Sequence, residues 1–334
     1  MPTRDELIAL CKEKGIRGFS GKNKAELEAL VAATATATEV AAAPPDTIVH
    51  VTEEEEKAAV AVPITPRITL HHGDCLDVMK KIPSDSVHLI LCDLPYGSTR
   101  CKWDSIIDID RLWAEYRRIL VKPTGVVLLF GQQPFTTKLI SANYEWYKYN
   151  LIWKKNKTTQ FLLANYRPMK CTEDICVFSP GGAAAASRTT GNMTYHPQNL
   201  VPVNIAKKNS AKRIGKMLNQ KHHLGENNKL LSETEYSQKF TNYPTEILEF
   251  DIESDTIHET QKPVQLVEYL IRTYSNQGDV VLDNTMGSGT TGIGCVLTGR
   301  SFIGIELEKK YFDLSKQRID AAVVAATTPS PNAD

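Results

Sequence analysis

The chain has 334 residues, of which 42% are hydrophobic and 23% charged, a composition typical of globular proteins. Lys and Arg balance Asp and Glu at 39 each, so the total charge points to neither an acidic nor a basic partner. The seven cysteines include no CxxC pair, which predicts reduced thiols and neither a disulfide framework nor a metal site. With no apolar run near 18 residues and no signal-peptide pattern, we expect no membrane span and a cytoplasmic location.

The first predicted unit covers residues 1–34 and consists of a helix, a glycine-rich turn and a second helix. Thr3 followed by Glu6 has the spacing of a capping box at a helix start. Apolar residues recur at helical spacing in both halves of this unit, which predicts two short amphipathic helices. A helical hairpin that contacts another protein is one alternative for this pattern. Residues 35–66, rich in Ala, Thr, Pro and Glu, are predicted to be a flexible linker.

Residues 67–330 are predicted to form one α/β domain. Apolar runs at 67–72, 87–92, 125–130, 149–153 and 174–178 indicate strands, and the run at 87–92 is continuous, as in a sheet covered on both faces. Leu112, Trp113, Tyr116 and Ile119 mark a helix between two of these runs. Strands that alternate with helices predict a doubly wound, mostly parallel sheet.

Residues 181–256 have little periodicity and are predicted to be a functional insertion. They overlap a basic part of the chain, since residues 151–240 carry 14 Lys and Arg against 5 Asp and Glu. Charge segregated in this way suits a face that meets phosphate groups, and a solvated basic loop is the alternative.

A glycine-rich segment follows the apolar run 280–282 and reads Asp283-Asn284-Thr285-Met286-Gly287-Ser288-Gly289-Thr290-Thr291. A helix ending near Gly299 and a strand ending in Glu306 come next. Glycines let the backbone approach a ligand closely, and an acidic side chain at the next strand end can bind ribose hydroxyls. The combination predicts a nucleotide-type cofactor site. Asp74 opens a short helix after the first strand, where a helix N-cap is the alternative to a cofactor contact.

Asp93-Leu94-Pro95-Tyr96 directly follows the strand at 87–92 and resembles the catalytic tetrapeptide of the DNA amino-methyltransferases. The segment from Asp283 to Thr291 resembles their S-adenosylmethionine loop, with Asn284 and Thr285 where the family has Pro and Phe. The order of the two segments resembles the permuted β-group of adenine-N6 and cytosine-N4 methyltransferases. The resemblance implies a Rossmann-like methyltransferase fold, S-adenosylmethionine as cofactor and double-stranded DNA with a flipped base as substrate.

The resemblance also implies a role for each residue of the tetrapeptide. Asp93 and the main-chain carbonyl of Leu94 would accept the two N–H groups of the target amine. Pro95 would stiffen the turn, and the Tyr96 ring would stack on the base. The alternative is a strand-to-loop turn in which Asp93 caps and Tyr96 packs. The implied cofactor-binding residues are Asp74, Cys75, Thr260, Gln261, Lys262, Asp283, Gly287, Ser288, Gly289, Thr290, Thr291 and Glu306.

Residues 3–33 resemble the SAP module, in which basic residues near the second helix face DNA phosphates; here these are Lys22 and Lys24. Lys154 and Lys155 match a family segment and are the other expected DNA contacts. An aspartate at the first motif position favours adenine, so we predict a site-specific DNA adenine-N6 methyltransferase. Cytosine-N4 methylation, another methyl acceptor such as RNA or protein, and a non-catalytic DNA-binding protein that holds S-adenosylmethionine are the alternatives. A homodimer is one option for the assembly, and the recognition sequence and any partner nuclease stay open.

Overall fold

The computed structural model describes residues 3, 24, 66–97, 107–184, 191–208, 235–253 and 261–327. The chain divides into two compact units, one made of residues 1–63 and 197–244 and the other of residues 64–196 and 245–334. The SAP-like module and the linker lie outside the described residues, apart from Thr3, the helical, exposed Lys24 and Pro66. Within the described residues, no helix is long and apolar enough to cross a membrane.

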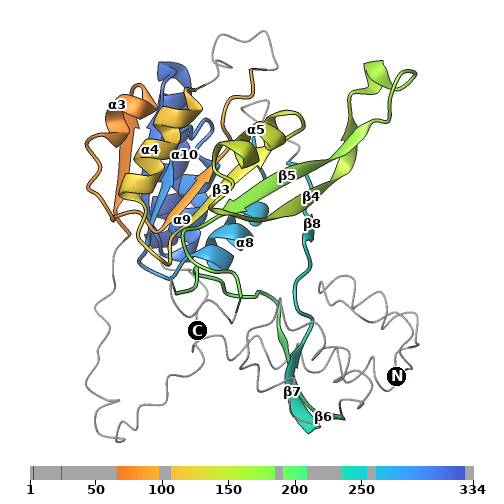
Figure 1. Ribbon diagram of the computed structural model, residues 1–334. Coiled ribbons are helices and arrows are strands. Elements are labelled where there is room, and N and C mark those ends of the chain that lie inside the picture. Colours follow the sequence, from red (N-terminus) through yellow and green to blue (C-terminus); the bar gives the residue numbers. More distant parts are fainter. Residues whose placement is uncertain are drawn as a thin grey trace, which may run out of the picture. The chain divides into compact units, whose positions relative to one another are not determined.

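An eight-stranded sheet forms the centre of the larger unit (Figure 1). Its order is β1-β10-β9-β2-β3-β5-β4-β8, and β5 runs antiparallel to both β3 and β4. The doubly wound, mostly parallel fold predicted from the sequence is confirmed. The strands are β1 (Ile68–His72), β2 (Leu89–Cys92), β3 (Val126–Gly131), β4 (Tyr147–Thr159), β5 (Lys170–Phe178), β8 (Ile247–Glu249), β9 (Val280–Asp283) and β10 (Ser301–Glu306). The helices are α3 (Cys75–Met79), α4 (Ile109–Ile119), α5 (Phe135–Ala142), the 3₁₀ helix η1 (Phe161–Leu163), α8 (Val264–Tyr274), α9 (Thr290–Thr298) and α10 (Lys309–Thr327).

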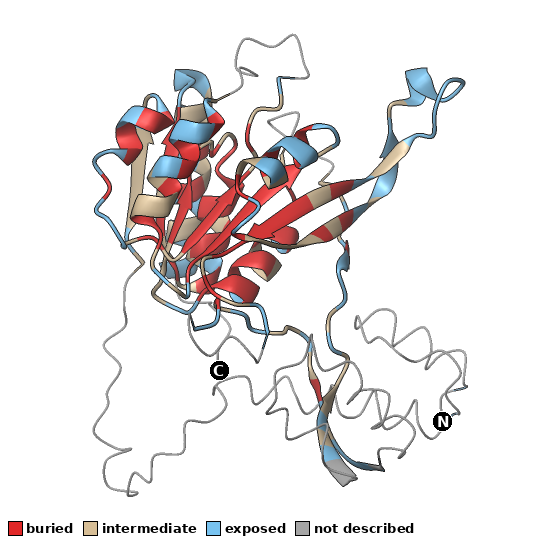
Figure 2. Cartoon of the chain, viewed as in Figure 1, coloured by how far each residue is buried: buried red, intermediate tan, exposed pale blue. Residues whose placement is uncertain are grey.

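Helices cover both faces of the sheet, which explains the continuous apolar runs of its central strands. In β2, Ile90 and Cys92 point into one hydrophobic core and Leu89 and Leu91 into the other, because successive strand residues face opposite sides. The first core takes side chains from α3, α4 and α5, and the second takes them from α8, α9 and α10. In both layers of helices, the residues that face the sheet are buried and those on the outer face are mostly exposed (Figure 2).

The ends of the helices follow local sequence signals. Asp74 caps α3, since its Oδ1 accepts a hydrogen bond of 2.8 Å from the main-chain N–H of Leu76. Asp108 caps α4 in the same way. Gly299 ends α9 in the left-handed conformation, with φ of 70°, as its position in the sequence predicts.

The strand order reverses direction between β2 and β9. From β9 the chain crosses through α9 to β10 on one side, whereas from β2 it crosses through α4 to β3 on the other. The two strands pair in parallel, with Leu89 opposite Val281 and Ile90 opposite Leu282. Their carboxyl ends lead directly into Asp93 and Asn284, so both sequence motifs meet at the topological switch point, where such sheets bind ligands.

Strand β4 is much longer than the sequence pattern indicates. A strand is predicted at 149–153, but β4 extends to Thr159 and forms with β5 an arm that projects from the body of this unit (Figure 1). The outer residues lack an alternating apolar pattern because they cover no core, and for that reason the sequence gives no strand signal there.

The smaller unit contains a two-stranded antiparallel sheet of β6 (Val201–Lys208) and β7 (Glu235–Thr241). Both strands fall within the segment 181–256 that the sequence analysis interprets as an insertion. Residues 245–253 of that segment belong to the larger unit, where β8 pairs in parallel with β4.

Candidate active site

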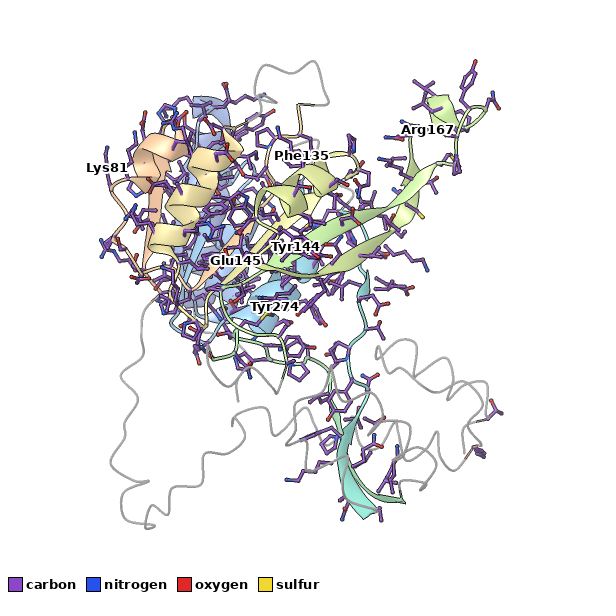
Figure 3. The ribbon with its side chains drawn as sticks, in the orientation of Figure 1. Lys81, Phe135, Tyr144, Glu145, Arg167 and Tyr274 are labelled. Atoms are coloured by element: carbon purple, nitrogen blue, oxygen red, sulfur yellow. The ribbon has the colours of Figure 1, made fainter. Side chains whose placement is uncertain are left out.

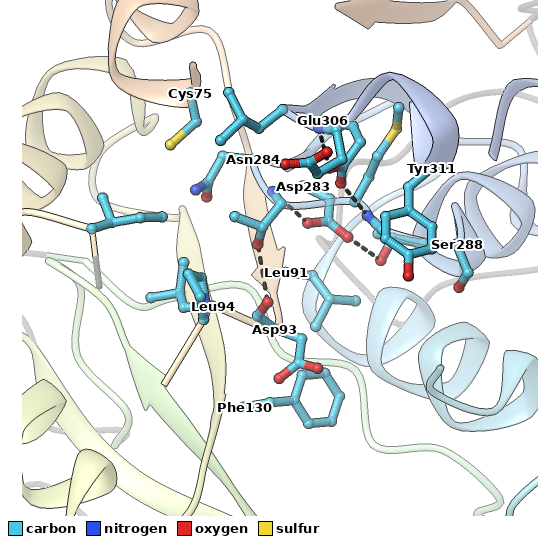
Figure 4. Close-up of a pocket in the computed structure, with 18 of the residues that line it drawn as sticks. Cys75, Leu91, Asp93, Leu94, Phe130, Asp283, Asn284, Ser288, Glu306 and Tyr311 are labelled. Carbon is cyan, nitrogen blue, oxygen red and sulfur yellow. Dashed lines mark hydrogen bonds between the residues drawn. The ribbon is translucent and has the colours of Figure 1, made fainter. Parts of the chain in front are cut away.

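A cavity of about 370 Å³ opens at the carboxyl ends of β1, β2, β9 and β10. Asp93, Asp283 and Glu306 lie around it, at the carboxyl ends of three different strands (Figure 4). Nearly all of the described residues that the sequence analysis assigned to the cofactor or to catalysis line this cavity. They are Asp74, Cys75, Asp93, Leu94, Pro95, Tyr96, Gln261, Lys262, Asp283, Gly287, Ser288, Thr290, Thr291 and Glu306.

Asp283 organises the glycine-rich loop from inside. Its Oδ2 accepts a hydrogen bond of 2.7 Å from the Thr291 hydroxyl, and its Oδ1 accepts one of 3.1 Å from the main-chain N–H of Thr285. The carboxyl group is buried, and burial raises its pKa to about 7. Gly289 does not line the cavity; it has a φ of 78°, and a Cβ there would lie 2.8 Å from Cβ of Ser315. Gly289 therefore serves the packing of α9 against α10.

Glu306 lines the cavity beside the glycine-rich loop. One carboxylate oxygen accepts a hydrogen bond of 2.9 Å from the main-chain N–H of Gly287, and the other accepts one of 2.8 Å from that of Glu308. Burial raises the pKa of Glu306. Each oxygen keeps a further lone pair for a ligand, which suits the hydroxyls of a ribose. Gly287 has a φ of 48°, so its backbone adopts a turn that favours glycine.

Asn284 replaces the proline of the family loop and binds the neighbouring strand. Its side-chain oxygen accepts hydrogen bonds from the Tyr116 hydroxyl and from Cys92 Sγ, 2.9 Å away. The Thr285 hydroxyl, in place of the family phenylalanine, donates to the main-chain carbonyl of Asp93 at 3.1 Å. The two departures from the family pattern thus connect the glycine-rich loop to the end of β2 and to Asp93, which follows it.

Asp93 is held from two sides by hydrogen-bond donors. The Tyr96 hydroxyl donates to Oδ1 at 2.8 Å, and the Lys262 ammonium forms a short ion pair with Oδ2. Both side chains reach a third group, Glu173, at 3.1 Å from the Tyr96 hydroxyl and 3.2 Å from Lys262 Nζ. The Lys155 ammonium pairs with the other oxygen of Glu173 at 2.7 Å. Two carboxylates therefore share one buried lysine.

Glu173 and Lys262 are only 4% and 8% exposed, so neither charge is stable without its partners. Burial raises the pKa of Asp93, and the negative charge of Glu173 adds to this, although the Lys262 ammonium opposes it. Burial would also raise the pKa of Glu173, but Lys262 and Lys155 outweigh it, and the net direction is downward. Glu173 therefore keeps its negative charge more firmly than Asp93.

Glu173 has no role in the sequence-based prediction. It lies in β5, which joins the sheet between β3 and β4, and no motif residue is near it in the sequence. Its one signal in the sequence is an acidic residue close to the apolar run that ends β5. Asp108, Arg111 and Tyr311, which also line the cavity, were not expected there either.

The predicted DNA contacts have different surroundings. Lys154 is exposed and pairs with Glu249 at 2.9 Å, whereas Lys155 turns inward to Glu173 and has only 15% of its side chain exposed. Lys22 and Thr260 lie outside the described residues, as does most of the loop after Tyr96, from residue 98 to 106.

The doubly wound fold, with a glycine-rich nucleotide loop beside an acidic tetrapeptide at the switch point, defines a methyltransferase-type α/β enzyme. The family described as DNA methylase matches the chain over residues 87–317, and the chain belongs to this family.

Individual relatives are distant. The chain is 25% identical to the type II methyltransferase M.HinfI of Haemophilus influenzae over 79% of its own length and 70% of the relative's. It is 26% identical to the DNA adenine methyltransferase YhdJ of Escherichia coli K12 over 76% of its own length and 83% of the relative's. The solved PvuII DNA methyltransferase, specific for cytosine N4, superposes with a TM-score of 0.50 at 14% identity, covering 79% of this chain and 94% of that one. This last likeness concerns the fold alone.

Proposed function

We propose that the chain transfers a methyl group from S-adenosylmethionine to the N6 amine of an adenine flipped out of double-stranded DNA. The observation that carries this proposal is the position of Asp93. Its carboxylate lies at the end of β2, in the same cavity as the glycine-rich loop that follows the adjacent strand β9. Asp93, whose carboxylate oxygens accept hydrogen bonds, would therefore lie next to the bound methyl donor.

The cavity suits S-adenosylmethionine in size and in the chemistry of its lining. About 370 Å³ is within the range of small-molecule sites. Glu306 would bind the ribose hydroxyls, and Asp74 and Cys75 would border the adenine ring. Ser288, Thr290, Gln261 and the amide groups of the loop would hold the methionine end. When bound, the cofactor supplies an electrophilic methyl group.

The residues around Asp93 solve the problem of a weak nucleophile. The lone pair of an exocyclic amine is delocalised into the ring, and acceptors for both N–H groups restore its nucleophilicity. Asp93 supplies a carboxylate and Leu94 a main-chain carbonyl. Tyr96 packs against Phe135 with ring centroids 5.0 Å apart, and its other face offers a stacking surface worth about 1–3 kcal/mol. That gain offsets much of the few kcal/mol that flipping a base costs.

Lys262 and Glu173 prepare Asp93 for this role. In the described structure Lys262 forms an ion pair with Oδ2 of Asp93, so an incoming amine competes with Lys262 for this carboxylate. Glu173 already contacts Lys262 at 3.2 Å and retains it when Asp93 is released. We assign both as positioning residues, because they act on the substrate through Asp93.

Adenine is favoured over cytosine by the aspartate at the first motif position and by the similarity to an enzyme named as a DNA adenine methyltransferase. Cytosine-N4 methylation requires the same geometry at Asp93 and is the second candidate. The proposal also includes a DNA-binding SAP-like module at residues 1–34, a linker at 35–66, a target-recognition role for 181–256 and a DNA contact at the exposed Lys154.

Nucleoside mass spectrometry tests the proposal. Unmethylated DNA is incubated with the full chain and S-adenosylmethionine, beside the variant Asp93→Ala. We expect N6-methyladenine from the unaltered chain and none from the variant, with cofactor binding retained because Asp283 and Glu306 are unchanged. Detection of N4-methylcytosine would identify cytosine as the target in place of adenine. The absence of any methylated base would reject the proposed reaction.

A further inference from the structure

The arm formed by β4 and β5 carries an exposed apolar end. Residues 156–159 and 161–169 are all exposed, including Phe161 at 78%, Leu162 at 90% and Tyr166 at 87%. Five of the 13 large hydrophobic side chains that are exposed in the described part of the chain fall within these nine positions, 161–169. The other eight are scattered. Since burying one such side chain is worth about 1.5–3 kcal/mol, a cluster left in water indicates a binding surface.

The charge of the arm restricts what this surface can bind. From Lys154 to Lys170 the chain contains five Lys or Arg and no Asp or Glu. Arg167 lies near the free end of the arm (Figure 3), and Lys157 is exposed on its outer part. A contact between the arms of two copies would bring two equally positive surfaces together, which is unfavourable. Polyanionic DNA satisfies the cations, and in a duplex apolar side chains can contact thymine methyl groups or insert between base pairs.

The base of the arm belongs to the group of charged side chains around Asp93. Lys155 of β4 pairs with Glu173 of β5, and Glu173 contacts Lys262 and Tyr96, which hold Asp93. At about 3.3 Å per strand residue, Phe161 lies roughly 15–20 Å from Lys155. At about 3.4 Å per base pair, this distance corresponds to roughly four to six base pairs, so the end of the arm is within reach of a duplex whose base enters the cavity at Asp93.

We infer that the β4–β5 arm is a second DNA-binding surface, in which Lys157 and Arg167 contact phosphates while Phe161 and Tyr166 contact bases farther along the same duplex. The inference rests on the proposed function, because it takes DNA as the substrate held at Asp93. It assigns to residues 156–169 a part of DNA binding separate from the segment 181–256 and from the SAP-like module.

Two variants of the full chain separate the charged from the aromatic contribution. Fluorescence anisotropy measures binding to a labelled duplex of mixed sequence, roughly 20 bp long, over a range of salt concentrations. The variant Lys157→Gln with Arg167→Gln should weaken binding and lower the slope of log K against log salt by about 1.5–2, near 0.9 for each phosphate that the variant no longer neutralises. The variant Phe161→Ser with Tyr166→Ser should weaken binding about 5- to 100-fold without changing the slope.

Tyr144→Ser is the matched control, since Tyr144 is 76% exposed on the body of the unit, away from the arm (Figure 3). Unchanged DNA affinity in both arm variants would overturn the inference. A loss of self-association in sedimentation, with DNA affinity retained, would overturn it in favour of a contact between copies. DNA affinity is measured without cofactor, so it does not depend on methyl transfer. If the arm variants weaken DNA binding but the unaltered chain makes no methylated base, the proposed reaction is rejected and the inference about the arm stands.

Discussion

Replacing Glu173 by Gln tests whether the shared lysine controls access to Asp93. The substitution keeps the shape of the side chain and removes its charge. At 3.2 Å and an effective dielectric constant of about 20, the attraction between Glu173 and Lys262 is at most about 5 kcal/mol. The amide still accepts a hydrogen bond, but one from an ammonium to a neutral group is weaker by about 1–2 kcal/mol. When an amine replaces Lys262 at Asp93, this difference adds to the barrier in the variant, and kcat/KM should fall about 5- to 30-fold.

The same substitution should shift the pH dependence of the reaction. Glu173 raises the pKa of Asp93 through its negative charge, so its removal lowers that pKa. Asp93 has to be ionised to accept the amine protons, and the acidic limb of kcat/KM should therefore move to lower pH. Methyl transfer from labelled cofactor to DNA across pH gives both quantities.

Asp174→Asn is the matched control for Glu173→Gln. It removes a negative charge from the next position of β5, where the side chain faces the other side of the sheet and accepts a hydrogen bond of 2.7 Å from Thr136. A purely structural role of Glu173 would lower activity without moving the pH profile. An unchanged kcat/KM, or an equal loss in the control, would contradict the role assigned to the Glu173–Lys262 pair.

Two further predictions concern stability and DNA binding. The buried Asp283 has its pKa raised from 3.8 to about 7, so between these values the folded chain binds more protons than the unfolded one and loses stability as pH rises, by up to roughly 4 kcal/mol. Asp283→Asn should flatten this dependence in urea unfolding at about pH 5 and about pH 8, and an equally steep profile would show that Asp283 is not its source. Deleting residues 1–40 should weaken duplex binding and lower its salt slope by about 0.9 for each phosphate that the SAP-like module neutralises, while the KM for the cofactor stays unchanged. Equal affinity after the deletion would reject the DNA-binding role of the module.

Local sequence was sufficient for the parts of the site that lie at strand ends. Asp93 and the glycine-rich loop each directly follow a continuous apolar run, and a parallel sheet places the carboxyl ends of its strands along one edge. The cap at Asp74 and the turn at Gly299 likewise depend on residues within one helical turn. Asp74 shows the limit of such reading, because it caps α3 and lines the cavity at once.

The alternation of strands and helices, and the residues at the strand ends, could be predicted because both depend on periodicity and on neighbours along the chain. The contact of two distant carboxylates with one lysine could not be predicted in this way. Glu173, Lys262 and Asp93 come from three separate parts of the chain, and sheet order and burial bring them together. The arm is likewise visible only in the folded chain, because its exposed strands bury no face and so carry no periodic apolar pattern.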